Sequence, residues 1–430
     1  MINTPSSLRL QIGIFGRTNV GKSTVLNLIL GQYAAITSSG AGTTTDVVKR
    51  SMELLPVGPV LFLDTAGLGD GSELSFERER KTWIALRRCD VAMVIIESGV
   101  WTEFEDDLIR RISKARCKPV LIINKIDIRK PDKDYIDKIK SFSDDVIQCN
   151  AASPESRDGF LHQFKNFLLA NMPSEFLAPI PMLGDLVPTG GHVVLIIPID
   201  IQAPKGRIIL PQVQAIRDSL DHNCIVTIVK ESEYRDFLKL LNKKPDLVVC
   251  DSQVVDKMVS WTPENIACTT FSILASRLKG NLISSVMGIN TVECLKPESR
   301  ILIAESCTHH PLEADIGRVQ IPRLLENYLG FLPHIDVVSG KDFPENLNSY
   351  DLVIHCGACM INRREMVSRV QQCIDVNVPI TNYGVCISYL RKTLKRVIKI
   401  FPKVMYRYYT NVVVTSSSKE KINVESIRMD

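Results

Sequence analysis

Two groups of residues in this chain of 430 have types and spacings that can perform chemistry. The first is the run GRTNVGKS from Gly16 to Ser23, which fits the phosphate-binding pattern G-x-x-x-x-G-K-[ST]. Its glycines let the backbone wrap closely around phosphates, and the amide groups that open the following helix attract negative charge. In this pattern Lys22 contacts the β- and γ-phosphates and Ser23 binds Mg²⁺. We expect the nucleotide to be held here by Gly16, Asn19, Val20, Gly21, Lys22, Ser23 and Thr24.

Later segments follow in the order that a GTP-binding protein needs. Asp64 begins the segment DTAG, where its carboxylate can hold the Mg²⁺ shell through water and the Gly67 amide can sense the γ-phosphate. In the later segment NKID, the Asp127 carboxylate can accept two N–H donors from a guanine edge. Adenine presents a different pattern, so this segment selects GTP over ATP. The expected base-side residues are Asn124, Lys125, Asp127 and Ala151.

The second group contains cysteines and histidines. Cys307 begins the segment CTHH, and His355 begins the segment HCGAC, which contains the C-x-x-C pair Cys356 and Cys359. Three thiolates with His309 or His355 could hold Zn²⁺ as a Cys₃His site, or a [4Fe–4S] cluster whose fourth iron is open or bound by another ligand. A redox pair or simple burial are the alternatives. The other nine cysteines are typical of small core residues.

Alternating strand-like and helix-like segments must position these residues. In the first 160 residues, short apolar runs that suit parallel strands buried on both faces alternate with amphipathic helical segments. Two further α/β stretches follow, and strands at 300–304 and 352–355 end just before Cys307 and Cys356. Parallel strands bring such ends to one sheet edge, where α/β folds bind ligands. The predicted fold class is therefore α/β, a P-loop domain followed by two α/β domains with mainly parallel sheets.

Proline and glycine spacing suggests the domain boundaries. We expect a nucleotide-binding domain at 1–170 and a linker at 171–191, followed by domains at 192–265 and 270–415 and a polar tail at 416–430.

Composition excludes several classes of protein. The hydrophobic fraction of 45 % and the charged fraction of 23 % are those of an ordinary globular protein. We expect no transmembrane helix, because every long apolar run is interrupted by charge, and no secretory signal at the N-terminus. A net charge of +4 is small for a dedicated nucleic-acid binder. These features indicate a cytoplasmic protein, or one in an equivalent reducing compartment, with neither a membrane nor a nucleic-acid partner.

The nucleotide motifs resemble those of the translation-factor-related GTPases, especially the branch that includes TrmE and Era. The run GTTTD from Gly42 to Asp46 is similar to that branch's switch I, written GTTRD, with threonine at 45 in place of arginine. The resemblance implies that Thr44 is a second Mg²⁺ ligand and that Asn19 helps to hold a K⁺ ion. Leu68 replaces the water-orienting glutamine of Ras-like proteins, so K⁺-stimulated, slow hydrolysis is expected. The expected catalytic residues are Lys22, Thr44, Asp64 and Gly67. Glu73 or Glu77 could orient water, or both could be solvated charges.

The two groups together resemble the HydF family, the GTPases of [FeFe]-hydrogenase maturation, over nearly the whole chain. The resemblance also includes the segments 315–317, 321–323 and 381–384. It implies GTP, GDP, Mg²⁺ and K⁺ as ligands and a [4Fe–4S] cluster on Cys307, Cys356 and Cys359, with His309 or His355 as a possible fourth ligand. It further implies a homodimeric scaffold that receives a transient diiron subcluster precursor from radical-SAM maturases and delivers it to apo-[FeFe]-hydrogenase.

Two other functions remain open at this stage. One is an RNA-associated GTPase of the TrmE or Era type, which predicts an RNA-binding module such as a KH domain with GXXG. The pair Gly190-Gly191 lies in the predicted linker and lacks that pattern. The other is a zinc-stabilised regulatory GTPase, because ligand identity alone does not separate zinc from an iron–sulfur cluster.

Overall fold

The structure is a computed structural model that describes residues 4–31, 47–65, 75–177, 180–199, 208–306, 315–340, 343–344 and 346–417. The chain divides into two compact units, Met1–Pro179 and Ile180–Asp430. Within the described residues, no helix is both long and apolar enough to cross a membrane. Each unit is α/β, which confirms the predicted fold class.

A six-stranded sheet in the order β2-β3-β1-β4-β5-β6 forms the centre of the first unit. Only β2 runs antiparallel to its neighbour. The inner strands β1 and β4 are buried along almost their whole length and are mostly apolar, because helices cover both faces of the sheet. The strands are β1 (Leu10–Phe15), β2 (Val48–Leu54), β3 (Gly58–Asp64), β4 (Val91–Glu97), β5 (Lys118–Asn124) and β6 (Val146–Gln148).

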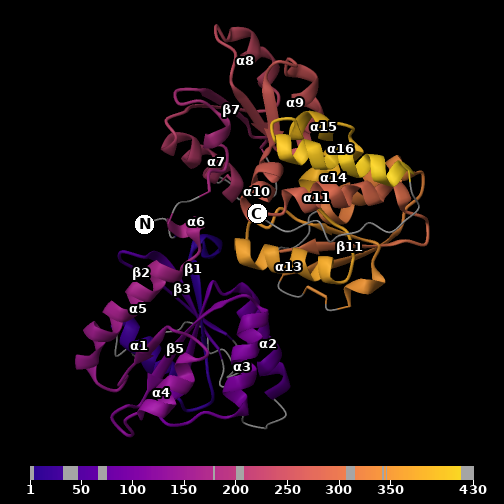
Figure 1. The fold of residues 1–430 in the computed structure, drawn as a ribbon. Coiled ribbons are helices and arrows are strands. Elements are labelled where there is room, and N and C mark those ends of the chain that lie inside the picture. Colours follow the sequence, from indigo (N-terminus) through magenta and orange to yellow (C-terminus); the bar gives the residue numbers. More distant parts are fainter. Residues whose placement is uncertain are drawn as a thin grey trace. The chain divides into compact units, whose positions relative to one another are not determined.

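Alternate side chains of these strands enter two cores. Ile12 and Ile14 of β1 pack with the helices α1 and α5 on one face, and Phe15 packs with α2, α3 and α4 on the other. Figure 1 shows α1 and α5 on one side of the sheet and α2 and α3 on the other. The helices are α1 (Lys22–Leu30), α2 (Ser75–Arg88), α3 (Glu103–Lys114), α4 (Lys133–Lys140), α5 (Arg157–Asn171) and the short α6 (Ser174–Leu177).

The second unit contains two four-stranded sheets, in the orders β10-β9-β7-β8 and β12-β11-β13-β14, and every strand pair in them is parallel. The first sheet consists of β7 (His192–Ile196), β8 (Ile225–Val229), β9 (Leu247–Cys250) and β10 (Ala267–Thr270). The second consists of β11 (Arg300–Glu305), β12 (His334–Ser339), β13 (Leu352–His355) and β14 (Ile380–Asn382).

One continuous core joins the two sheets of this unit. Val193 of β7 and Ile301 of β11 belong to the same buried cluster, together with α10, α11 and α14. A smaller core packs α13 against the opposite face of the β11 sheet (Figure 1). The helices are α7 (Leu210–Asp221), α8 (Tyr234–Leu240), α9 (Val255–Trp261), α10 (Phe271–Lys279), α11 (Leu282–Gly288), α12 (Ile321–Leu329), α13 (Arg363–Asp375), α14 (Tyr383–Leu390), α15 (Leu394–Ile398) and α16 (Pro402–Ser417).

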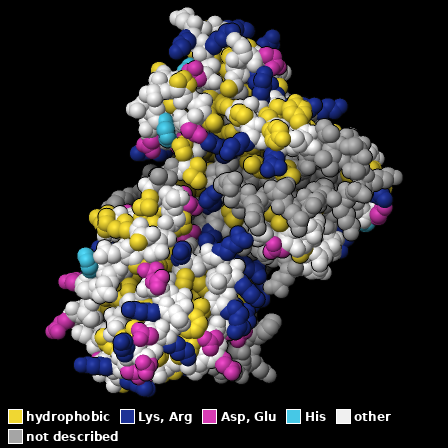
Figure 2. Space-filling model, in the orientation of Figure 1, with side chains coloured by type: hydrophobic (Ala, Val, Ile, Leu, Met, Phe, Trp, Pro, Cys, Tyr) yellow, Lys and Arg dark blue, Asp and Glu magenta, His cyan; other side chains and the backbone are white. Residues whose placement is uncertain are grey.

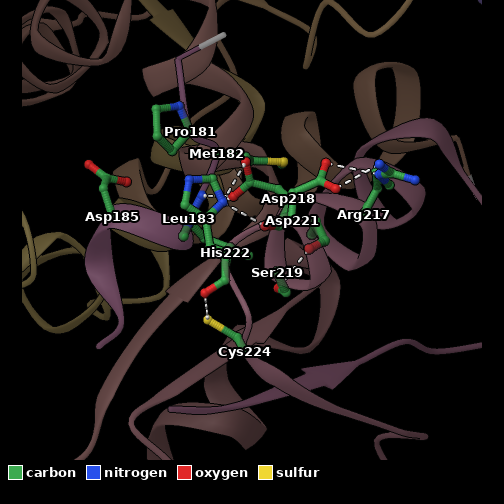
Figure 3. A network of polar contacts seen from close by, with 12 residues as sticks. Pro181, Met182, Leu183, Asp185, Arg217, Asp218, Ser219, Asp221, His222 and Cys224 are labelled. Carbon is green, nitrogen blue, oxygen red and sulfur yellow. Dashed lines mark hydrogen bonds and ion pairs between the residues drawn. The ribbon is translucent and has the colours of Figure 1, made fainter. Parts of the chain in front are cut away.

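The segment that we predicted as a linker is partly built into the second unit. Met182 and Leu183 are buried in its core. The Asp218 carboxylate of α7 accepts the amides of Leu183 and Gly184, each at 2.8 Å (Figure 3). Arg277 of α10 donates to the Asp185 carboxylate at 2.8 Å. Residues 180–187 therefore belong structurally to the second unit, although their proline content is typical of a linker.

We predict that Asp218→Ala destabilises the first part of the second unit by about 3 kcal/mol, because two buried amides lose a charged acceptor. Asp221→Ala, on the same helix, is the matched control. Its carboxylate pairs with Arg217 in solvent, where ion pairs contribute little. Hydrogen exchange resolved over residues 180–280 measures both variants. Equal protection of the two variants would show that Asp218 does not anchor this segment.

Candidate nucleotide site and metal centre

The phosphate loop lies between β1 and α1, and two of its glycines have conformations that other residues avoid. Gly16 has φ of +142° and Gly21 has φ of +94°. A Cβ atom on Gly16 would lie 2.3 Å from the Ile95 carbonyl oxygen, and one on Gly21 would lie 2.3 Å from the Asn124 side-chain nitrogen. Only glycine fits at either position, so the predicted wrapping of the backbone is present in the structure.

Lys22, the first residue of α1, is buried inside this loop. Its Nζ donates to the carbonyl oxygens of Gly16 at 3.0 Å and Arg17 at 2.7 Å. Burial lowers the pKa of Lys22 to about 8, and the Asp64 carboxylate partly offsets this effect. An ammonium group held among backbone carbonyls is already desolvated, so an arriving phosphate need not strip water from it.

Asp64, at the end of β3, faces the start of α1. The Ser23 hydroxyl donates to Asp64 Oδ2 at 3.4 Å. Burial raises the pKa of the Asp64 carboxyl, and Lys22 and Ser23 oppose this shift. The structure thus brings together the serine and the aspartate that we expect to hold Mg²⁺, and both supply the oxygen ligands that this cation prefers.

Asn124, at the end of β5, connects two loops of the site. Its Nδ2 donates to the Val20 carbonyl at 2.9 Å, and its Oδ1 accepts the Ala151 amide at 3.1 Å. Asp127 is exposed, as a residue that meets a guanine edge must be. Lys125 has φ of +60° and pairs with Glu97 at 2.9 Å. Asn124 therefore fixes the distance between the phosphate loop and the loop on the base side.

Several predicted residues lie outside the described part of the chain. These are Thr44, Thr45, Gly67, Leu68 and Glu73, and the side chain of Glu77 is likewise not described. Asn19 and Thr24 are described and exposed, and Asn19 has φ of +64°. The potassium, switch and water-orienting roles therefore stay predictions.

The candidate metal centre lies at the carboxyl ends of β11 and β13, the two central strands of their sheet. Ala304 pairs with His355 in the strand register, so the segments that follow these strands start side by side. The Ser306 amide donates to Cys356 Sγ at 3.1 Å. The residue before Cys307 thus contacts the sulfur of Cys356, as the strand assignment predicts, although Cys307 and His309 lie outside the described residues.

The C-x-x-C segment forms a tight turn. Ala358 has φ of +56° and is buried, while Cys356 and Cys359 are half-buried. Among the residues that the structure describes, no three cysteine, histidine, aspartate or glutamate side chains converge on one metal position. The described part of the candidate centre is therefore a pair of cysteines on a turn, with the strand that leads to Cys307 beside it.

His355 is fully buried, and both of its ring nitrogens have partners. Nδ1 lies 2.9 Å from the Cys356 carbonyl oxygen, and Nε2 lies 3.1 Å from Arg369 Nη1. Burial and the neighbouring guanidinium lower the pKa of His355 to about 3, so the ring is neutral. Nδ1–H then donates to the carbonyl and Nε2 accepts from Arg369. In this arrangement neither nitrogen is available to a metal, in contrast to the fourth-ligand role that we considered for His355.

Sequence reasoning missed the residues that hold this histidine. Arg369 is 2 % exposed, pairs with Glu365 at 2.9 Å and donates to the Gly340 carbonyl at 3.2 Å. The only sequence signal is the i,i+4 spacing of Glu365 and Arg369, which usually marks an exposed helix pair.

A second missed group surrounds Glu305. Its carboxylate accepts from the Ser339 hydroxyl at 2.9 Å and from the Tyr383 hydroxyl at 3.3 Å. Burial, with Cys356 and Glu305 close by, raises the pKa of Tyr383. A Cβ on Gly317 would lie 2.1 Å from the Tyr383 hydroxyl, which explains why glycine occurs at 317.

The sheet order, the phosphate loop after β1 and the NKID segment after β5 define the first unit as a P-loop GTPase domain, which binds GTP. Residues 11–125 match the family described as 50S ribosome-binding GTPase. Residues 182–280 and 284–400 match the hydrogen maturase F dimerization and tetramerization domains. The chain belongs to the hydrogenase maturase F (HydF) family, whose GTPases take part in [FeFe]-hydrogenase maturation. The two named domains imply self-association.

Individual relatives resemble the GTPase region. GTPase Der of Persephonella marina is 35 % identical over 137 residues, which cover 31 % of this chain and 30 % of that protein. The tRNA modification GTPase MnmE of Halorhodospira halophila is 38 % identical over 122 residues, 27 % of this chain and 25 % of that protein. The chain thus spans less than a third of the length of these relatives.

Solved structures with some similarity also contain GTPase domains. A variant of Aquifex aeolicus Era bound to GDP and AlF₄⁻ has a TM-score of 0.33 and 19 % identity, covering 54 % of this chain and 98 % of that one. The FeoB G-domain of Methanococcus jannaschii has a TM-score of 0.29 and 18 % identity, covering 38 % and 97 %.

We predict that Asn124→Ala weakens GDP binding roughly tenfold to a hundredfold, because a buried carbonyl and a buried amide both lose their partner. Asn166→Ala, at an exposed α5 position where the side-chain amide lies 3.2 Å from His162 Nε2, should leave binding unchanged. Titration with a fluorescent GDP analogue measures both. Wild-type affinity in Asn124→Ala would mean that the link between the loops does not position the nucleotide.

Proposed function

We propose that this chain is a GTP-hydrolysing scaffold that binds a [4Fe–4S] cluster through Cys307, Cys356 and Cys359 and delivers the diiron subcluster to apo-[FeFe]-hydrogenase. The observation that carries the proposal is the contact of the Ser306 amide with Cys356 Sγ, in a chain that belongs to the HydF family. The contact supports placing the third cysteine beside the C-x-x-C pair. Radical-SAM maturases are the proposed source of the precursor.

The donor set suits an iron–sulfur cluster. Three thiolates leave one iron without a cysteine, and that iron can accept an exchangeable ligand, as a carrier requires. The Ser306 N–H directed at a ligand sulfur is a contact that tunes such clusters. Since both nitrogens of His355 have partners, we propose that His355 positions Cys356 through its carbonyl group. Candidates for the fourth ligand are then His309, Glu313 or Asp315, of which only Asp315 is described, as the N-cap that accepts the Arg318 amide at 2.8 Å.

The GTPase reaction depends on residues of the first unit. We propose that Lys22 binds the β- and γ-phosphates and that Ser23, Asp64 and Thr44 surround Mg²⁺. The Gly67 amide would sense the γ-phosphate. Asn19 and a K⁺ ion would supply the positive charge that an arginine finger gives other GTPases. The exposure of Asn19 supports this role, since its side chain is open to an ion from solvent.

The domain proposal follows the family matches. Residues 1–170 bind GTP, a dimerisation domain follows from about 192 to 265, and the cluster-binding domain runs from 270 to 415. The matches at 182–280 and 284–400 support this division and move the middle boundary toward the end of α10. Homodimer formation is supported by β8, an edge strand whose Ile225 and Ile228 are 61 % and 50 % exposed.

An RNA-associated GTPase is the competing proposal, and one surface favours it. Figure 2 shows basic side chains gathered on the side of the GTPase unit where α2 and α3 lie. Arg80 of α2 and Arg110 and Lys114 of α3 are exposed. Asp107 pairs with Arg110 at 3.4 Å and with Arg111 at 2.7 Å, which reduces the positive field of this face. We therefore favour protein partners over RNA.

We predict that replacing K⁺ by Na⁺ slows GTP hydrolysis by about tenfold or more, because a cation at Asn19 stabilises charge that develops in the transition state. Phosphate release at constant ionic strength measures the effect. Asn19→Ala should remove the difference between the two ions. Equal wild-type rates in the two salts would rule out the potassium role.

We predict that Cys356→Ala loses the cluster yet retains GTP hydrolysis, while Lys22→Ala loses hydrolysis yet retains the cluster, since the two sites lie in separate units. Anaerobic reconstitution with iron and sulfide, followed by visible absorption and EPR, measures the cluster. Cys294→Ala is the matched control, because Cys294 is exposed and outside the proposed ligand set. A colourless zinc-containing wild-type protein would overturn the cluster proposal. Loss of hydrolysis in Cys356→Ala would overturn the separation of the sites.

A further inference from the structure

A buried cation lies beneath the C-x-x-C turn. Lys279, the last residue of α10, is 7 % exposed, and its Nζ donates to the Ile361 carbonyl at 2.6 Å. Ile361 follows Cys359 by two residues, so this hydrogen bond ties the end of the cysteine turn to α10. Within the described residues, no carboxylate pairs with Lys279. Burial of an ammonium group without a counter-charge is costly, and buried charges in proteins are usually paired.

The surroundings of Lys279 leave no room for a soluble ligand. A small polar hollow under the turn is lined by Ser276, Lys279, Asn281, Cys356 and Asn382, and it has no space large enough for a water molecule. Its other polar groups satisfy one another. The Ser276 hydroxyl donates to the side-chain Oδ1 of Asn281 at 2.8 Å and accepts from the side-chain Nδ2 of Asn382 at 2.9 Å. The positive charge therefore faces the cysteine turn rather than a bound anion.

Metal binding would supply the negative counter-charge that Lys279 does not have among the described residues. Cys356 lines the same hollow, and Cys359 is close enough to interact electrostatically with the lysine. Thiolates bound to iron or zinc carry net negative charge, and opposite charges attract strongly where water is excluded. If the cysteines remained neutral thiols, the buried charge of Lys279 would have no counter-charge and would lower the stability of the fold.

We propose that Lys279 is a positioning residue of the metal centre, whose buried positive charge compensates the thiolates of Cys356 and Cys359 and the metal group they hold. The inference rests on the proposed function, since it assumes that these cysteines bind metal. The cation comes from the end of the dimerization-domain match at 182–280, and both thiolates come from the tetramerization-domain match at 284–400. The centre is thus completed across the boundary of the two domains.

Two uncharged substitutions of Lys279 distinguish the effect of its positive charge from the effect of its hydrogen bond. Lys279→Gln removes the charge and keeps an N–H donor for the Ile361 carbonyl, whereas Lys279→Met removes both. Lys296→Met is the matched control, because Lys296 is exposed. The three full-length variants are compared with wild type after reconstitution with iron and sulfide, and circular dichroism melting confirms that each is folded.

The midpoint potential of the cluster is the decisive measurement. A buried positive charge favours the reduced, more negative state, so both Lys279 variants should shift the potential to more negative values, while Lys296→Met should not. A wild-type potential in Lys279→Gln would overturn the proposal. Lys279 would then serve only to hydrogen-bond the Ile361 carbonyl.

A Co²⁺ titration of the apo-protein tests Lys279 without an iron–sulfur cluster. Absorption from cobalt–thiolate bonds reports binding, and Lys279→Gln should weaken Co²⁺ affinity about tenfold or more relative to wild type. Equal affinities would overturn the proposal. If wild type binds Co²⁺ but never assembles a cluster, the scaffold proposal fails, while the titration still decides the role of Lys279.

Discussion

Burial of parallel strands on both faces is the constraint on which this protein depends. The inner strands of all three sheets are largely apolar and buried over most of their length, so most of their side chains serve packing. Reactive groups can then stand only where strands end. Lys22 lies after β1, Asp64 ends β3, Asn124 ends β5, and the cysteine turn follows β13. Parallel pairing brings the carboxyl ends of strands to one edge of a sheet. The nucleotide site and the candidate metal centre therefore both lie at such an edge, although their chemistries are unrelated.

The two sites differ in how their loops are supported. In the GTPase unit, one amide side chain, Asn124, joins the phosphate loop to the base-side loop through two backbone contacts. In the second unit, support comes from buried charged groups, with Arg369 held between Glu365 and His355 on one side of the turn and Lys279 beneath it. Buried charges are expensive unless they are paired, and the side chains of Arg369 and Lys279 donate to backbone carbonyls or to side chains around the turn.

Much of this organisation could be predicted from sequence, because it is local. The strands predicted at 300–304 and 352–355 are present as β11 and β13, within one residue of the predicted bounds, because short apolar runs define them. The strand β2 was not predicted, because its alternating exposed residues depend on pairing with β3. The partners of His355 and the burial of Lys279 also escaped prediction. Both depend on contacts between segments distant in sequence, and no spacing rule encodes those contacts.

Most of the described cysteines are buried, so oxidants and alkylating agents react selectively with the few that are not. Burial raises the pKa of Cys149, Cys373 and Cys386 to about 12, so these sulfurs stay protonated at neutral pH and react poorly with oxidants and alkylating agents. Cys356 and Cys359 are half-buried on their turn, and Cys294 is exposed. Exposure to air or to a maleimide would therefore modify the turn and spare the core. Under the proposed function, such a sample would lose its metal-binding capacity while its circular dichroism spectrum remained that of an intact fold.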